Sequence, residues 1–168
     1  MTPEALLRKY GISEPPVPVE KIAEEEGIAV CALPASEDIS GAIVRKGAEV
    51  IIAVNPAHAI TRRRFTIAHE LGHFFLHNEL LEHVDHDFRV SWRNSTSSAA
   101  VNWKEIQANQ FAANLLMPTS FVQRDLNLLD KIDDGSIRWL SKRYHVSPLA
   151  MQIRLTNLGL VPSVLEFR

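Results

Sequence analysis

The 168-residue sequence contains a single cysteine, Cys31, which excludes an internal disulfide. It also lacks any apolar run near the roughly 20 residues that a membrane-spanning helix needs. Residues 1–4 show neither the basic start nor the apolar run of a signal peptide. We therefore expect a cytoplasmic protein without a membrane partner. Because Cys31 lies in an apolar, strand-like run, we expect a buried small hydrophobic residue rather than a reactive thiol.

An excess of charge of one sign is also missing. The 18 Lys and Arg residues nearly balance the 20 Asp and Glu residues, and the formal net charge is −2. Such a chain has no long-range attraction for nucleic acid or anionic lipid, so we expect no direct nucleic-acid partner. With 46% hydrophobic residues, the chain is long enough to bury a substantial core. We expect residues 1–168 to form a single domain.

The most informative segment runs from Phe65 to His77 and has the pattern of one buried, apolar helix. It contains His-Glu-x-x-His, with His69 and His73 on the same helical face, about 6 Å apart along the axis. Two such imidazoles can bind one ion, and catalytic zinc takes three protein ligands and keeps one position open. Glu70 lies about 100° around the helix from His69, where a general base could take a proton from a metal-bound water. The segment therefore predicts half of a zinc hydrolase site.

The third ligand is marked less clearly. His77 lies roughly 12 Å along the helix from His69, so the two cannot share an ion with His73. Several acidic or imidazole side chains follow the helix and could reach the ion from a loop: Glu79, Glu82, His83, Asp85, His86 and Asp87. Glu105, near the start of a second predicted helix, is another candidate, and Asn109 is placed to hydrogen-bond a ligating histidine. An exposed Glu105 and a solvent-facing Asn109 are equally compatible with the spacing.

The flanking segments predict the remaining elements. We expect short helices over residues 3–10 and 19–26, strands over 28–33, 40–46 and 49–54, and a longer helix over 103–117. The last two strands flank Gly47-Ala48 as a probable hairpin, which indicates a small antiparallel sheet before the His-Glu-x-x-His helix. Three arginines, Arg62, Arg63 and Arg64, open that helix, and we expect them to splay into solvent or to pair with nearby acids.

Residues 137–159 have the pattern of a helix, a tight turn and a second helix, as in a helix-turn-helix module. The second helix is mainly apolar and carries one basic residue, Arg154, whereas a recognition helix should present polar and basic side chains to base edges. We therefore expect a helical hairpin, about residues 134–160, that packs on the active-site helices and belongs to the same domain.

Two motifs together closely resemble the ImmA/IrrE family of bacterial and phage metallopeptidases. They are Phe65-Thr-Ile-Ala-His-Glu-Leu-Gly-His-Phe-Phe-Leu-His77 and Glu105-Ile-Gln-Ala-Asn-Gln-Phe-Ala-Ala-Asn-Leu-Leu-Met-Pro118, and the resemblance extends over roughly residues 18–160. It implies that His69, His73 and Glu105 bind zinc and that Glu70 is the catalytic acid/base. It also implies an α+β fold in which a small antiparallel sheet packs on a helical zincin-type core.

The same resemblance implies a function. Members of the family typically act on a helix-turn-helix repressor and relieve repression of a mobile element or a stress response. Some are associated with toxin–antitoxin-like pairs. We therefore expect a zinc-dependent endopeptidase of the gluzincin type whose substrate is a helix-turn-helix transcriptional repressor or an antitoxin-like regulator. The donor that stabilises the oxyanion is unassigned, and Arg89, Tyr144 and His145 are candidates.

Two alternatives belong to other classes. The first is a zinc-containing binding protein that acts as an antirepressor, because it sequesters a regulator without cutting it. The second, which we favour less, is a DNA-binding regulator built on residues 136–158. It would show a strongly salt-dependent affinity for duplex DNA.

Overall fold

The computed structural model describes residues 1–34, 39–77, 82–86 and 99–161, with the backbone alone for 82–86 and 99–102. The helices are α1 (Pro3–Lys9), α2 (Val19–Glu25), α3 (Ile60–Leu76), α5 (Ala99–Leu116), α6 (Thr119–Leu126), α7 (Asp134–Tyr144) and α8 (Pro148–Asn157). The strands are β1 (Ile28–Ala32), β2 (Ile39–Lys46), β3 (Glu49–Val54) and β4 (Glu82–His86). The expected α+β fold is confirmed, and most predicted helices and strands lie within one or two residues of their expected ends.

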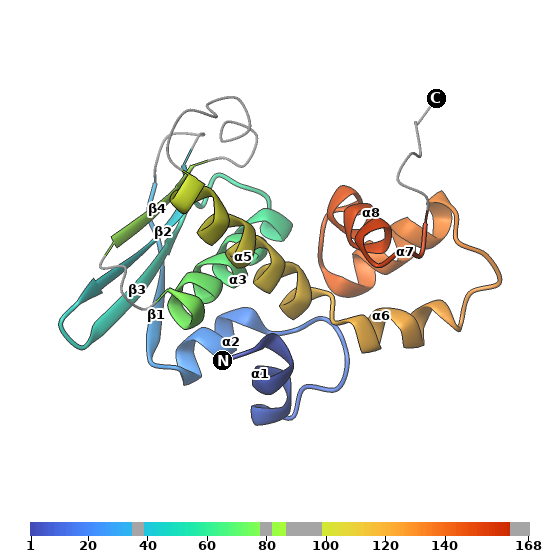
Figure 1. The fold of residues 1–168 in the computed structure, drawn as a ribbon, viewed down its shortest axis with the longest axis horizontal. Helices are drawn as coiled ribbons and strands as arrows, with labels where there is room; N and C mark the ends of the chain where they lie inside the picture. Colours follow the sequence, from blue (N-terminus) through green and yellow to red (C-terminus); the bar gives the residue numbers. More distant parts are fainter. Residues whose placement is uncertain (35–38, 78–81, 87–98, 162–168) are drawn as a thin grey trace.

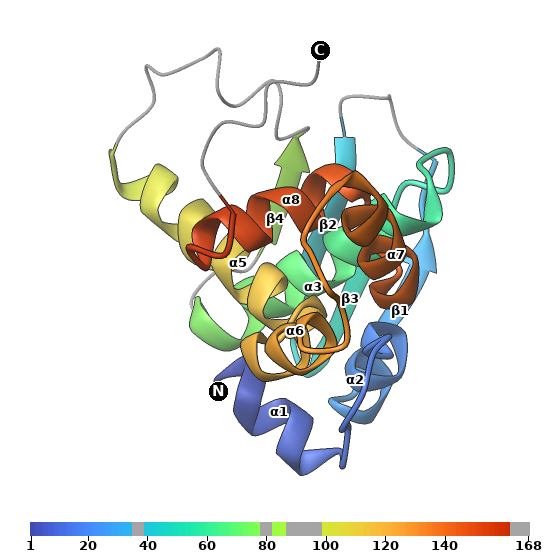
Figure 2. The same ribbon diagram turned by 90° about the vertical axis from the view of Figure 1, so that its right-hand side faces the viewer.

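The elements form three groups along the long axis of the molecule. In Figure 1 the sheet lies at one end, α3 and α5 lie side by side in the middle with α1 and α2 below them, and α6, α7 and α8 lie at the other end. Figure 2 looks past the C-terminal helices toward the sheet behind them. Buried apolar side chains from each of these helices and from the sheet belong to one core cluster. None of the helices in the described ranges has the length and apolar content that crossing a membrane requires.

The sheet has the strand order β1-β3-β2-β4 and is mixed rather than antiparallel. The predicted hairpin of β2 and β3 is present, with Lys46 opposite Glu49. β4 is also antiparallel to β2, but β1 runs parallel to β3, with Ile28 opposite Val50. The expectation of an antiparallel sheet was wrong for β1 because this strand pairs with β3 instead of with β2, its neighbour in sequence. β1 and β3 both run opposite to β2, which lies between them in the sequence, so they run in the same direction where they pair.

A second error concerns the burial of Cys31. Cys31 lies opposite Ala53 and is exposed, not buried as expected from its apolar run. The inner face of the sheet packs on α3, as the close approach of Gly41 to Thr66 indicates. Cys31 alternates with the inward-facing Val30, so its side chain lies on the opposite face.

Arg64 behaves differently from the arginines before it in the sequence. It is only 6% exposed, and its guanidinium donates hydrogen bonds to the carbonyl oxygens of Val17 at 2.8 Å and His145 at 3.4 Å. Glu20 lies 3.5 Å from it, which confirms the expected pairing with an acid, and the side chain does not splay into solvent. The residue joins α3 to the segment before α2 and to the turn between α7 and α8.

The C-terminal helices form the expected hairpin. Asp133 and Ser147 cap the N-termini of α7 and α8, and His145 adopts a left-handed conformation (φ 53°) in the turn between them. Arg154 of α8 is 8% exposed and donates hydrogen bonds to the carbonyl of Met117 at 3.0 Å and to the hydroxyl of Thr119 at 3.1 Å. It therefore anchors α8 to the end of α5 and is withdrawn from the surface.

A buried carboxylate connects α6 to α7. Asp125 has a fully buried side chain, which accepts hydrogen bonds from Arg143 Nε at 2.7 Å and from the hydroxyl of Tyr144 at 2.9 Å. Burial alone would raise the pKa of Asp125, but the hydrogen bonds from Arg143 and Tyr144 outweigh it and hold the pKa below its usual value. Burial, together with this hydrogen bond, raises the pKa of Tyr144, so its hydroxyl remains a donor.

We expect Asp125→Asn to lower the free energy of unfolding by about 1–3 kcal/mol at pH 7, because Arg143 and Tyr144 lose their charged acceptor. The folded pKa lies below the unfolded value of about 3.9, so this stabilisation is complete well above that value and is lost as the pH falls through the folded pKa. In urea unfolding, the difference in free energy of unfolding between wild type and Asp125→Asn should stay constant well above pH 4 and should shrink as the pH falls below the unfolded pKa of about 3.9. Asp130→Asn, at an exposed position, is the control, and equal stability of the two variants at pH 7 would contradict the assignment.

Candidate metal centre and active site

α3 places both histidines of the His-Glu-x-x-His motif in the interior. The helix is continuous from Ile60 to Leu76, so residues four apart share one face. His69 is 2% exposed and His73 is 1% exposed, and their rings meet edge to face with centroids 4.7 Å apart. Their Nε2 atoms are 3.0 Å apart and therefore point toward a common position.

α5 brings Glu105 to the same position. One carboxylate oxygen lies 3.3 Å from His69 Nε2 and the other lies 3.3 Å from His73 Nε2. Ligand atoms of the three residues lie within 4.8 Å of one another. Of the third-ligand candidates, the structure thus brings Glu105 to the histidines. Of the other candidates, Glu79 and Asp87 lie outside the described residues, and for residues 82–86 only the backbone is described.

The donor set fits a zinc ion. Ligands at about 2.0–2.2 Å from a tetrahedral zinc lie about 3.3 Å from one another, which matches both nitrogen–oxygen distances. Two imidazole nitrogens and a carboxylate are also the donor types of catalytic zinc sites, which leave one position for water or substrate. These three residues could therefore hold the metal without rearrangement of either helix.

Asn109 contacts the ring of His69. Its Oδ1 lies 3.0 Å from His69 Nδ1, the nitrogen that faces away from Glu105. Because this oxygen is an acceptor, the proton of the neutral imidazole belongs on Nδ1, which leaves the lone pair of Nε2 for a metal. Burial lowers the pKa of His73 and likewise favours the neutral, ligating form. The structure thus places Asn109 where the sequence predicted it.

Glu70 is fully buried and follows His69 on the same helix. A carboxylate held in the interior next to a metal ligand can accept a proton from a water molecule and return it to a leaving group. The position therefore suits a general base.

The oxyanion candidates have different outcomes. Tyr144, one of the three candidates, is fully buried and its hydroxyl donates to Asp125, so it is not available as an oxyanion donor. The reason is a tertiary contact with α6 that its own segment does not reveal. His145 lies exposed in the turn after α7, where its role remains a prediction, and Arg89 lies outside the described residues.

The sequence did not indicate that three residues lie together around the C-terminal end of α3, namely His77, Trp103 and Arg45. His77 is 2% exposed, and its ring lies 5.4 Å from the ring of His73 and 5.5 Å from that of Trp103, so it extends the line of contacts between α3 and α5. Arg45 on β2 donates a hydrogen bond to the carbonyl of Phe74 at 3.0 Å, near the C-terminal end of α3, where a cation is favourable. Its inward position in the strand alternation was the available signal.

Comparisons with known proteins gave a family match and a similar fold. The family model of the IrrE N-terminal-like domain, Peptidase_M78, matches residues 23–156. Among solved structures, a Mycobacterium tuberculosis transcriptional regulator is similar, with a TM-score of 0.63 and 18% sequence identity over 96% of this chain. The match covers 46% of that regulator, so this chain spans about half its length, and the likeness concerns the fold alone. No match was found among curated proteins.

We expect Asn109→Ala to weaken zinc binding by about 10- to 100-fold, because His69 would lose the acceptor that fixes its tautomer and ring orientation. Competition with a chromophoric chelator measures this change without any substrate. Asn114→Ala, the same substitution further along α5, serves as the control and should bind zinc as the wild type does. Equal affinities for the two variants would exclude the orienting role of Asn109.

Proposed function

Because the chain belongs to the IrrE N-terminal-like domain family, a family of peptidases, we propose that it is a zinc-dependent endopeptidase. The observation that carries the proposal is the convergence of His69 Nε2, His73 Nε2 and the Glu105 carboxylate, with Glu70 buried beside them. In this proposal His69, His73 and Glu105 hold the metal, and Asn109 orients His69. We further propose that residues 1–168 act as one metallopeptidase domain that includes the hairpin at about 134–160, which the shared buried core supports.

The mechanism divides the chemistry between the metal and Glu70. A bound zinc ion would supply Lewis-acid chemistry, which makes water more acidic and polarises a carbonyl. Glu70 accepts a proton from the attacking water and then donates it to the amide nitrogen that leaves. Burial of the Glu70 side chain keeps its carboxylate at a fixed place for both proton transfers.

The proposed substrate is a protein, namely a helix-turn-helix transcriptional repressor or an antitoxin-like regulator. Family membership supports this class, since such regulators are the partners that the resemblance implies. The near-neutral charge of the chain and the absence of a membrane-spanning helix among the described residues agree with action on a protein in the cytoplasm.

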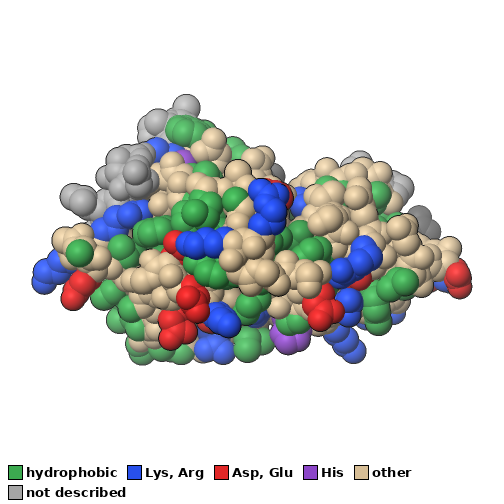
Figure 3. Space-filling view, turned by 90° about the horizontal axis from the view of Figure 1, so that it is seen from below, with side chains coloured by type: hydrophobic (Ala, Val, Ile, Leu, Met, Phe, Trp, Pro, Cys, Tyr) green, Lys and Arg blue, Asp and Glu red, His purple; other side chains and the backbone are tan. Residues whose placement is uncertain are grey.

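Direct DNA binding is less well supported than peptide hydrolysis. The basic residue of α8, Arg154, is buried against Met117 and Thr119 and cannot reach a phosphate or a base edge. Figure 3 shows acidic and basic side chains interspersed over the lower face of the molecule. A continuous basic surface would be expected of a protein that binds duplex DNA.

We expect Glu70→Gln to bind zinc as tightly as the wild type and to reduce cleavage by at least about 100-fold, because the amide cannot accept the proton of the attacking water. The test is intact-mass analysis of a candidate helix-turn-helix regulator after incubation with zinc-loaded wild type or variant. A new cleaved species with the wild type alone is the expected result. Glu24→Gln, at an exposed position in α2, is the matched control.

Each other outcome has a defined meaning. Undiminished cleavage by Glu70→Gln would refute the role of Glu70. If wild type and regulator co-elute without cleavage, the sequestering antirepressor is the better description. If they neither bind nor react, the chosen regulator is the wrong partner, while zinc binding by His69, His73 and Glu105 can still be measured separately.

A further inference from the structure

The outer face of the sheet, which points away from α3, is apolar throughout its middle. Strand pairing places its residues in two cross-strand rows, and Leu33 continues the pattern beyond β1. The rows are Ala29–Ile51–Val44 and Cys31–Ala53–Ala42. Leu33 is 55% exposed and Ile51 is 39% exposed, and Ala29 and Cys31 are exposed as well, whereas Val44 is half-buried and the small side chains of Ala42 and Ala53 are buried between their neighbours. We call these seven residues the outer patch.

Such a composition is unusual for a sheet with one face in solvent. Strands that bury one face alternate apolar residues inside with polar residues outside, whereas near-continuous apolar strands belong to sheets covered on both faces. The inner residues of these strands, such as Ile28, Ile43 and Ile52, are buried beneath the helices. In Figures 1 and 2 the labelled helices all lie to one side of the sheet. The outer patch therefore has the pattern of a covered surface with no described helix over it.

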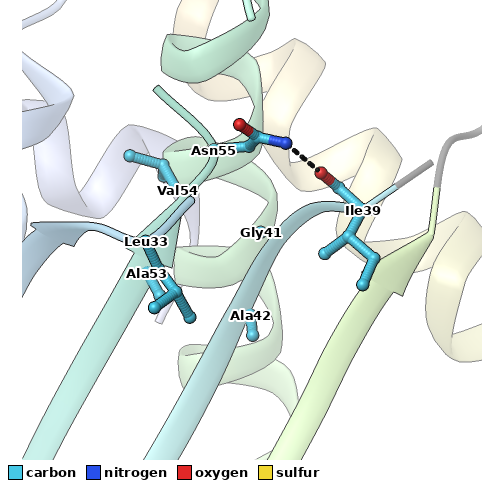
Figure 4. Close-up of a pocket in the computed structure, with 7 residues that line it drawn as sticks. All are labelled: Leu33, Ile39, Gly41, Ala42, Ala53, Val54 and Asn55. Atoms are coloured by element: carbon cyan, nitrogen blue, oxygen red, sulfur yellow. Dashed lines mark hydrogen bonds between the residues drawn. The ribbon is translucent and has the colours of Figure 1, made fainter. Parts of the chain in front are cut away.

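The outer patch contains an exposed side chain, Leu33, and a small pocket beside it. Figure 4 shows a small pocket with Leu33 on one side, Ile39 on the other and the short side chains of Ala42 and Ala53 between them. The side chain of Asn55 holds one rim, because it donates a hydrogen bond to the carbonyl of Ile39 at 3.0 Å. An apolar side chain from another molecule would find only apolar contacts in this hollow.

We propose that the outer patch is the contact surface of a symmetric dimer, with a second copy of this chain as its occupant. The charges at its edge are self-complementary, because Lys46 and Glu49 are exposed cross-strand partners at the hairpin. A two-fold axis can place Lys46 of one copy opposite Glu49 of the other. The exposed Leu33 side chain and the pocket lie within the same patch, as an isologous interface requires. The net charge of −2 causes little repulsion between copies.

The area of the patch limits the affinity that the dimer can have. Three strands about 4.8 Å apart and about five residues long give a flat area on the order of 250 Å². Standard stable interfaces bury about 800 Å² per partner, so the dimer should be weak and reversible, with a dissociation constant in the micromolar range or above. The inference does not depend on peptidase activity, and the same measurement applies if the proposed function is wrong.

The test is sedimentation velocity of the full chain from about 1 µM to several hundred µM, a range chosen for a weak interface. We expect the wild type to dimerise with rising concentration and Ile51→Glu to weaken the dimer at least tenfold, since a carboxylate would be buried against apolar side chains. Leu33→Glu is a second variant at a more exposed position. Ile60→Glu makes the same change at a side chain that is 61% exposed on α3, outside the patch, and should dimerise like the wild type.

Cys31 provides an independent readout, because it is the only thiol of the chain and lies inside the patch. In the wild type its rate of reaction with Ellman's reagent should fall at high protein concentration, and in Ile51→Glu the rate should not change. A chain that stays monomeric over the whole range, with a constant thiol rate, would overturn the proposal. So would a dimer that Ile51→Glu and Leu33→Glu leave intact.

Discussion

The close approach of α3 to α5 is the constraint on which the site depends. A Cβ atom at Gly72 would lie 3.0 Å from the Cα of Ala108 and 3.1 Å from its carbonyl oxygen, so the backbones meet where one of the two residues has no side chain. At this separation His69 reaches Asn109, and Glu105 lies within 3.3 Å of both histidines. A larger residue at position 72 would move apart the two helices that carry the ligand set.

Much of this arrangement could be predicted from the sequence, because it depends on local periodicity. The spacing of His69 and His73 fixes their shared helical face, and the spacing of Glu105 and Asn109 does the same on the second helix. Which third ligand joins the histidines could not be decided from spacing, since that choice depends on how α5 packs on α3. Family resemblance favoured Glu105, and the observed packing brings Glu105 to the histidines.

The errors share a different cause, which is contact between segments far apart in the chain. The apolar run at residues 28–33 indicated a strand but could not reveal that it pairs with β3 or which of its residues face the helices, so Cys31 was wrongly expected to be buried. Arg64 stands in a run of three arginines that resembles a solvated surface, yet its partners are the carbonyls of Val17 and His145. Tyr144 was available as a donor only while Asp125, on another helix, was unknown as its acceptor.

Because the three donor residues come from two helices, a cation bound by all of them would also act as a cross-link within the folded chain. The unfolded chain does not hold these donors together, so every increment of metal affinity becomes an increment of folding free energy. At a free metal concentration 100 times the dissociation constant this linkage amounts to about 2.7 kcal/mol, a sizeable part of the stability of an ordinary domain. Metal supply would then also govern how long the folded protein persists.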